Sequence, residues 1–117
     1  FETRVALAKE FRKYRPRVVI GFGGKTPLAS PDHWQAMQIT DAAVFYSRLT
    51  KWDEHFDHLP VYTIPMQLYF RLAFEPAIQE GNTNQFTIDI GDTLDLKLKA
   101  IRCYGSQFPE EKSHVFE

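Results

Sequence analysis

The chain has 117 residues, a length that suits one domain with a single buried core. Hydrophobic residues make up 44% of it and charged residues 25%, so it is too apolar to be intrinsically disordered. The formal net charge is -1, and basic residues cluster only between Arg12 and Arg17, which predicts neither a nucleic-acid partner nor a membrane-surface role. No apolar stretch reaches the ~18–20 residues that cross a bilayer.

The one cysteine, Cys103, cannot form a disulfide within the chain. A single cysteine and no evident signal peptide favour a reducing, cytoplasmic location. Because Cys103 lies in an apolar pattern, it is predicted to be a small buried residue rather than a nucleophile. The chain begins at Phe1 and ends at Glu117 inside predicted elements, so we expect it to be a segment of a longer domain.

The first element is predicted to be a helix over Glu2–Tyr14, ending before Pro16. Val5, Ala8 and Phe11 recur at three-residue spacing and form its apolar side. Charged residues occupy the rest of the helix, namely Arg4, Lys9, Glu10, Arg12 and Lys13.

A strand–loop–helix unit is predicted next. The short apolar run Val18–Phe22 is typical of a parallel strand that is buried on both faces. After a glycine-containing loop, Ser30 is a suitable N-cap and Pro31 suits the first helical position, with a helix predicted as far as about Leu49. This order is half of a βαβ unit, which predicts an α/β fold.

The remaining elements are less regular. Residues 51–60 are predicted to be an irregular polar loop, and Val61–Phe70 a strand that Pro65 interrupts. A turn at 80–84 leads to a strand over Phe86–Ile90, with Phe86, Ile88 and Ile90 pointing inward. The segment after Asp92 fits either a strand or a helix, and its composition favours a helix capped by Asp92 and stopped at Gly105. Another helix is predicted to begin within 109–116.

The segment Ser30-Pro31-Asp32-His33 is where the sequence places chemistry, because ligands of open α/β sheets bind at the carboxyl ends of the strands. His33 would project from the first helical turn towards that edge, and Asp32 could orient an imidazole nearby. The residue types alone also fit a surface histidine, and one histidine does not make a zinc site, which takes about three protein ligands. A second polar cluster, His55, Asp57 and His58, fits solvated loop residues better than metal ligands.

In this order, the strand Arg17–Phe22, the segment Ser30–His33, the stretch Phe86–Thr93 and the helix-forming stretch Lys97–Phe108 resemble the LmbE/PIG-L family of zinc-dependent N-deacetylases. The last two stretches are especially similar to the bacillithiol-pathway branch. The resemblance spans nearly the whole chain and implies that residues 1–117 are the C-terminal portion of one Rossmann-like domain, a three-layer sandwich around a mostly parallel sheet.

The resemblance implies a zinc ion (Zn2+) as cofactor and His33 as its third protein ligand. An early His-Pro-Asp-Asp motif, expected upstream of Phe1, supplies the other two ligands and the general base. Family members usually carry His-Pro-Asp-His where this chain has Ser30 to His33. Asp32 of this motif is retained, and the resemblance implies that it is a catalytic residue. Ser30 stands where the family has a histidine that is taken to stabilise the oxyanion. His58 is one residue that could take the place of that histidine.

The hypothesis from the resemblance is a hydrolase that removes acetyl from an N-acetylglucosaminyl (GlcNAc-type) small molecule. The alternative is a non-catalytic α/β sugar-binding or interaction module, which the loss of histidine at Ser30 favours. With one ligand of three, the isolated segment is expected to be inactive. A homo-oligomer is compatible with the sequence, and no nucleic-acid or membrane partner is expected.

Overall fold

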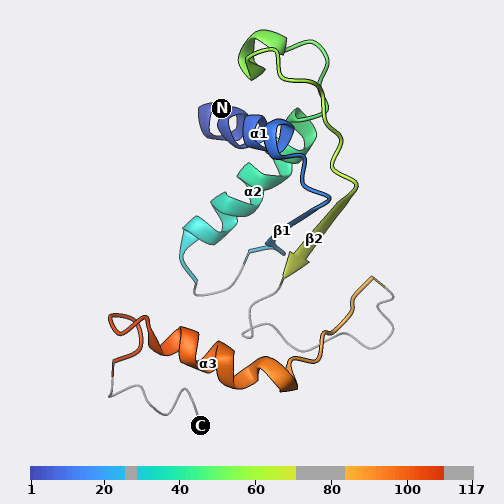
Figure 1. Ribbon diagram of the computed structural model, residues 1–117. Coiled ribbons are helices and arrows are strands. Elements are labelled where there is room, and N and C mark those ends of the chain that lie inside the picture. Colours follow the sequence, from blue (N-terminus) through green and yellow to red (C-terminus); the bar gives the residue numbers. More distant parts are fainter. Residues whose placement is uncertain (26–28, 71–83, 110–117) are drawn as a thin grey trace. The chain divides into compact units, whose positions relative to one another are not determined.

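A computed structural model describes residues 1–25, 29–70 and 84–109 (Figure 1). The chain divides into two compact units, Phe1–Ala77 and Ile78–Glu117, and each is described by itself. In the described ranges, helices and a small parallel sheet occur together, in agreement with a mixed α/β class. None of the described helices has the length and apolarity that a membrane crossing requires.

The first helix, α1, runs from Glu2 to Tyr14, as predicted. Its end is set by Arg15, which adopts the left-handed conformation with φ 52° and ψ 54° and donates its backbone N–H to Phe11 O. The residue before a proline is expected to leave the right-handed helical region, and here it does so in the left-handed rather than the extended direction.

The sheet consists of two parallel strands, β1 (Val18–Phe22) and β2 (Met66–Phe70), paired in register from Val18↔Met66 to Phe22↔Phe70. The prediction for β1 is confirmed. The prediction of a strand over Val61–Phe70 is too long, because β2 begins directly after Pro65. Proline has no N–H to give to the ladder, so it precedes the paired region instead of interrupting it.

The helix α2 (Pro31–Tyr46) packs against α1 and against β1. The cap at Ser30 and the start at Pro31 are confirmed, whereas the helix ends three residues before the predicted Leu49. A Cβ at Gly21 would lie 3.5 Å from the Thr40 methyl, an ordinary van der Waals distance, which shows that this part of β1 faces α2.

Helix α2 covers one face of the sheet, and α1 packs against α2. Val19 is buried on that face, and the side chains of Gln67 and Tyr69 both donate hydrogen bonds to Asp41 of α2, at 2.8 and 2.9 Å. Side chains alternate along a strand, so Val18 and Ile20 of β1 and their partners Met66 and Leu68 of β2 lie on the other face.

That second face is apolar and largely open. Val18, Ile20 and Met66 are 42%, 63% and 51% exposed. The expectation that β1 is buried on both faces is therefore wrong for the described chain, because the two helices lie on one side only.

The second unit contains a short 3-10 turn, η2 (Gly91–Thr93), followed by the helix α3 (Leu94–Arg102). The choice of helix for this segment is confirmed, and it ends before the predicted stop at Gly105. Asp92 lies within η2 and is not the cap, since Thr93 holds the N-cap position without a side-chain bond. Gly91 N donates instead to Asp89 Oδ1 at 2.8 Å.

The predicted strand at Phe86–Ile90 is wrong. These residues form no strand, and Phe86 and Ile88 are 67% and 70% exposed instead of inward-facing. A strand needs a hydrogen-bonded neighbour, and the sheet in the described residues pairs β1 with β2 only. Alternation of apolar residues therefore did not suffice to form an element here.

Cys103 is exposed, which contradicts its prediction as a buried residue. It follows the last turn of α3, and its thiol points back to Lys99 O at 3.4 Å. The predictions for residues 80–83 and for a helix beyond Pro109 lie outside the described residues.

The core of the first unit joins both helices to the loop after α2. Val5, Ala8, Ala43 and Phe56 form it, and Ala8, Ala43 and Phe56 are fully buried. Phe56 closes a 3-10 turn, η1 (Asp53–Phe56), inside the segment that was predicted to be polar and irregular. One aromatic residue thus converts that loop into part of the core.

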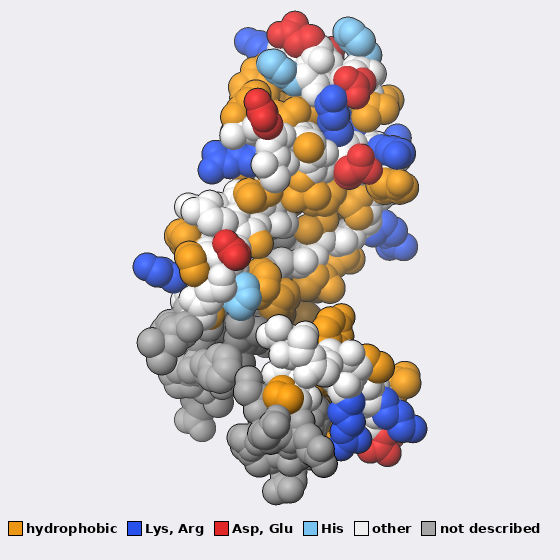
Figure 2. All heavy atoms as spheres, turned by 90° about the vertical axis from the view of Figure 1, so that its left-hand side faces the viewer, with side chains coloured by type: hydrophobic (Ala, Val, Ile, Leu, Met, Phe, Trp, Pro, Cys, Tyr) orange, Lys and Arg blue, Asp and Glu red, His pale blue; other side chains and the backbone are white. Residues whose placement is uncertain are grey.

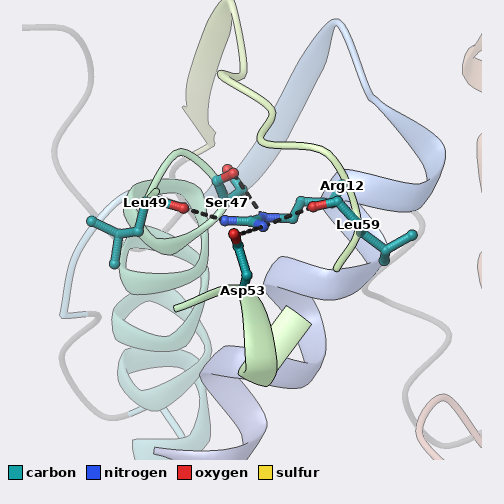
Figure 3. Close-up of polar contacts among 5 residues, drawn as sticks. All are labelled: Arg12, Ser47, Leu49, Asp53 and Leu59. Atoms are coloured by element: carbon teal, nitrogen blue, oxygen red, sulfur yellow. Dashed lines mark hydrogen bonds and ion pairs between the residues drawn. The ribbon is translucent and has the colours of Figure 1, made fainter. Parts of the chain in front are cut away.

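Arg12 lies in the middle of this core, with a fully buried side chain (Figure 3). Its guanidinium donates to three backbone carbonyls that end or follow α2, Ser47 O at 3.0 Å, Leu59 O at 2.9 Å and Leu49 O. The same group lies 3.8 Å from the centroid of the Phe56 ring. Burial lowers the Arg12 pKa, and the charge of Asp53, 3.9 Å away, raises it in part. Arg12 is therefore buried although it lies outside the apolar positions predicted for α1.

We predict that Arg12→Met lowers the free energy of unfolding by about 2–4 kcal/mol, because a shape-similar apolar side chain leaves Leu49 O and Leu59 O without a donor and Ser47 O with Tyr62 N alone. Urea unfolding measures this loss. Lys13→Met is the matched control: Lys13 is exposed, forms a 3.9 Å pair with Glu10 and lies 4.9 Å from the centroid of the exposed Tyr14 ring, so its loss is expected to stay within about 0.5 kcal/mol. Equal losses in both variants would show that the hydrogen bonds from Arg12 to the three carbonyls do not stabilise the fold.

Candidate functional site

The candidate site is the edge where β1 and β2 end and α2 begins. Parallel strands present their carboxyl ends at the same edge, and in this sheet those ends are Phe22 and Phe70. The backbone beyond β1 stays attached to this edge, because Gly23 N donates to Phe70 O at 2.9 Å. This is the location at which open α/β sheets place ligands.

His33 lies in the first turn of α2 and its ring lies against this edge. The imidazole stacks on the Phe22 ring with centroids 4.5 Å apart and planes 14° from parallel. Phe22 in turn contacts Phe70, with ring centroids 4.6 Å apart. The structure therefore brings His33 to the strand ends, beside two aromatic side chains.

Nδ1 of His33 is buried and has no hydrogen-bond partner among the described residues. A buried polar atom without a partner costs about 1–3 kcal/mol. Such atoms are uncommon in folded proteins and point to a ligand, an ion or a water that completes them.

Ser30 and Asp32 interact with each other and not with that nitrogen. Ser30 Oγ accepts from Asp32 N at 3.3 Å and donates to Asp32 Oδ2 at 3.1 Å, and both residues are exposed. The Ser30 carbonyl accepts from His33 N at 3.1 Å. Ser30 thus acts as the cap of α2, and Asp32 does not serve as the partner that orients the imidazole.

At this edge, His33 is the described side chain that could bind a metal. Among the described residues no group of three His, Cys, Asp or Glu side chains is close enough to hold a metal ion. His33 nevertheless fits as a single ligand, because its buried nitrogen is not already engaged in a hydrogen bond.

The second polar cluster lies at the other end of α2. Asp57 forms an ion pair with Lys9 at 2.8 Å, and His58, in the left-handed conformation, is exposed. Arg12 holds the next residue, Leu59, beside the carbonyl of Ser47. From there to His33 the helix extends for about 20 Å at 1.5 Å per residue, so His58 cannot replace a side chain at the first turn.

A shallow hollow of about 240 Å³ lies away from His33, over the second half of α2 and β2. Its lining includes Asp41, Arg48 and Ile64. Burial raises the pKa of the neighbouring Tyr69 hydroxyl, and its hydrogen bond to Asp41 and the charge of Asp41 raise that pKa further. The carboxylate is thus used to tie β2 to α2.

The aromatic pair at the strand ends was missed from the sequence. Phe22 and Phe70 were assigned only as strand residues, yet the ring of Phe22 stacks on His33 and the ring of Phe70 contacts Phe22. The signal that could have found them is an aromatic residue in the last position of each of two parallel strands.

Charge is interspersed over the first unit. In the upper part of the face shown in Figure 2, Lys and Arg side chains alternate with Asp and Glu, and hydrophobic side chains lie between them. This face therefore offers no continuous basic track for a phosphate backbone. In a comparison with known protein families, no family model matches this chain.

We predict that Ser30→Ala lowers the free energy of unfolding by about 1 kcal/mol, since it removes the cap oxygen of α2. Ser30→Thr keeps that oxygen and is the control, with a smaller loss expected. Urea unfolding of the three proteins measures the difference. A loss as large in Ser30→Thr as in Ser30→Ala would show that the side-chain oxygen does not stabilise the helix.

Proposed function

We propose that this chain forms part of a zinc-dependent N-deacetylase of the LmbE/PIG-L type, which removes acetyl from a GlcNAc-type conjugate. The observation that carries the proposal is the position of His33. Its imidazole lies at the carboxyl edge of two parallel strands and has a buried nitrogen without a hydrogen-bond partner among the described residues. In the family that this sequence resembles, the histidine at the matching position is a zinc ligand.

The finer fold proposed is the Rossmann-like sandwich. Two helices on one side of a parallel sheet are compatible with it. The open face also supports it, because Val18, Ile20 and Met66 are apolar there and a third layer would remove them from water. The proposed sandwich would include further strands beside β1 and β2 and a layer that covers this face.

A bound zinc would lower the pKa of a coordinated water and polarise the acetyl carbonyl. His33 would supply one neutral nitrogen ligand. The two remaining ligands and the general base would come from an early His-Pro-Asp-Asp segment outside these 117 residues.

Ser30 and Asp32 would lie beside the reacting amide. The hydroxyl of Ser30 can donate a hydrogen bond to a developing oxyanion only by releasing Asp32 Oδ2, which it now contacts at 3.1 Å. It cannot carry the positive charge of an imidazolium. Without another donor the rate would be about 10²–10³ lower than with the usual histidine.

A specific observation favours a second candidate, a non-catalytic α/β module. Ser30 Oγ is fully used in capping α2 and binding Asp32, which is a structural role that needs no reaction. Such a module would retain the sheet edge and its aromatic side chains for binding a sugar.

We predict that His33→Ala lowers the zinc content of the full-length protein from about one ion per chain to well below half, because a three-ligand site loses one ligand. Metal analysis after dialysis measures it. His58→Asn is the matched control: it also removes an imidazole, and asparagine tolerates the positive φ of 55° at this position. Full zinc occupancy in His33→Ala would overturn the ligand assignment.

We also predict acetate release from a GlcNAc conjugate by the full-length zinc-loaded protein, and a decrease of at least about 10²-fold in His33→Ala. Zinc binding with no acetate release from any GlcNAc conjugate, together with binding of the intact conjugate, would favour the non-catalytic module.

A further inference from the structure

A histidine that binds a metal is normally oriented through its second nitrogen, which donates to a carboxylate or a backbone carbonyl. If the free Nδ1 of His33 binds the metal, the second nitrogen is Nε2, and Nε2 forms no such bond among the described residues; the adjacent carboxylate of Asp32 contacts Ser30 instead. The ring must therefore be held in its plane by other contacts.

Stacking supplies the contact. The rings of His33 and Phe22 are nearly parallel, at 14°, with centroids 4.5 Å apart. Turning the imidazole about its bond to Cβ would drive its edge into the phenyl ring, so the stack restricts that rotation.

Phe22 is itself held by the sheet. It is the last residue of β1, and its ring lies 4.6 Å from that of Phe70, the last residue of β2. The bond from Gly23 N to Phe70 O closes this edge at 2.9 Å. A support built on paired strands is more rigid than one built on a loop.

We propose that Phe22 is the positioning residue that fixes the plane of the His33 imidazole for metal binding, in place of the usual hydrogen-bonding partner. This inference rests on the proposed function, because it assumes that His33 is a ligand. Phe22 touches neither metal nor substrate in this role and acts through His33.

The test compares Phe22→Leu, which removes the ring, with Phe22→Tyr, which retains it, in the full-length protein. Phe45→Leu is the matched control, since it makes the same change in the second half of α2, where Phe45 is exposed and contacts neither His33 nor Phe22. Zinc affinity is measured by competition with a chelator, and the visible spectrum of the cobalt-substituted protein reports the coordination geometry. Thermal unfolding of each variant reports stability.

The expected result is zinc binding about 10–100-fold weaker in Phe22→Leu, with altered cobalt bands, and binding within about 3-fold of wild type in Phe22→Tyr and Phe45→Leu. Equal weakening in Phe22→Leu and Phe45→Leu would overturn the specific role of Phe22. If His33→Ala loses zinc while Phe22→Leu binds it normally, the positioning role fails and the ligand assignment stands. Unchanged zinc binding in His33→Ala would overturn both the ligand assignment of His33 and the positioning role of Phe22.

A measurement on the unmodified protein applies even if Phe22→Leu does not fold. The ring current of a stacked phenyl moves the His33 ring-proton resonances upfield, and Phe22→Tyr is expected to retain that shift. Ring protons at ordinary chemical shifts in both proteins would overturn the proposal.

Discussion

The first unit depends on the burial of one cation. Arg12 joins the end of α2 to the loop that follows it, because its guanidinium donates to the carbonyls of Ser47 and Leu59 (Figure 3). Neither carbonyl lies within the helix. Carbonyls at and beyond the end of a helix have no helical partners, and a guanidinium with five donors can satisfy several at once. Ionic burial is costly by itself, so the hydrogen bonds and the Phe56 ring are what make this position tolerable.

The contacts of Arg12 also affect the opposite end of α2. The helix has 16 residues and so extends for about 24 Å, with Arg12 acting on its C-terminal end and His33 in its first turn. Fixing the far end and packing Ala43 against α1 sets the axis of the helix. Contacts to the sheet, such as those of Asp41, then set how its first turn meets the strand ends. The position of His33 is therefore an outcome of the whole unit.

The elements that are determined by residues close together in the sequence were predicted correctly. The cap at Ser30, the proline at the first position of α2 and the apolar spacing of α1 needed no knowledge of distant residues. The same holds for the strand β1. The sequence also placed the chemistry at Ser30–His33, and the structure brings that segment to the strand ends.

What could not be predicted depended on long-range contacts. A charged residue at position 12 is exposed by any local rule, and only the arrival of carbonyls from residues 47, 49 and 59 makes its burial favourable. The failed strand at Phe86–Ile90 has the reverse cause, since its alternation was correct but no neighbour pairs with it in the described residues. The stacking of Phe22 on His33 likewise joins two elements through a loop whose path the sequence does not specify.

The role of position 30 follows from a conflict between stability and chemistry. A histidine there would offer a proton donor, but serine is among the best N-cap residues and histidine is not. The Ser30 hydroxyl closes the first turn through Asp32, and its carbonyl accepts from the backbone of His33. Serine therefore orders the turn that carries the imidazole, and in the proposed deacetylase it would do so at the expense of a donor for the oxyanion. A chain that places a histidine on an aromatic support at a sheet edge gains from a rigid first turn whether it hydrolyses its ligand or only binds it.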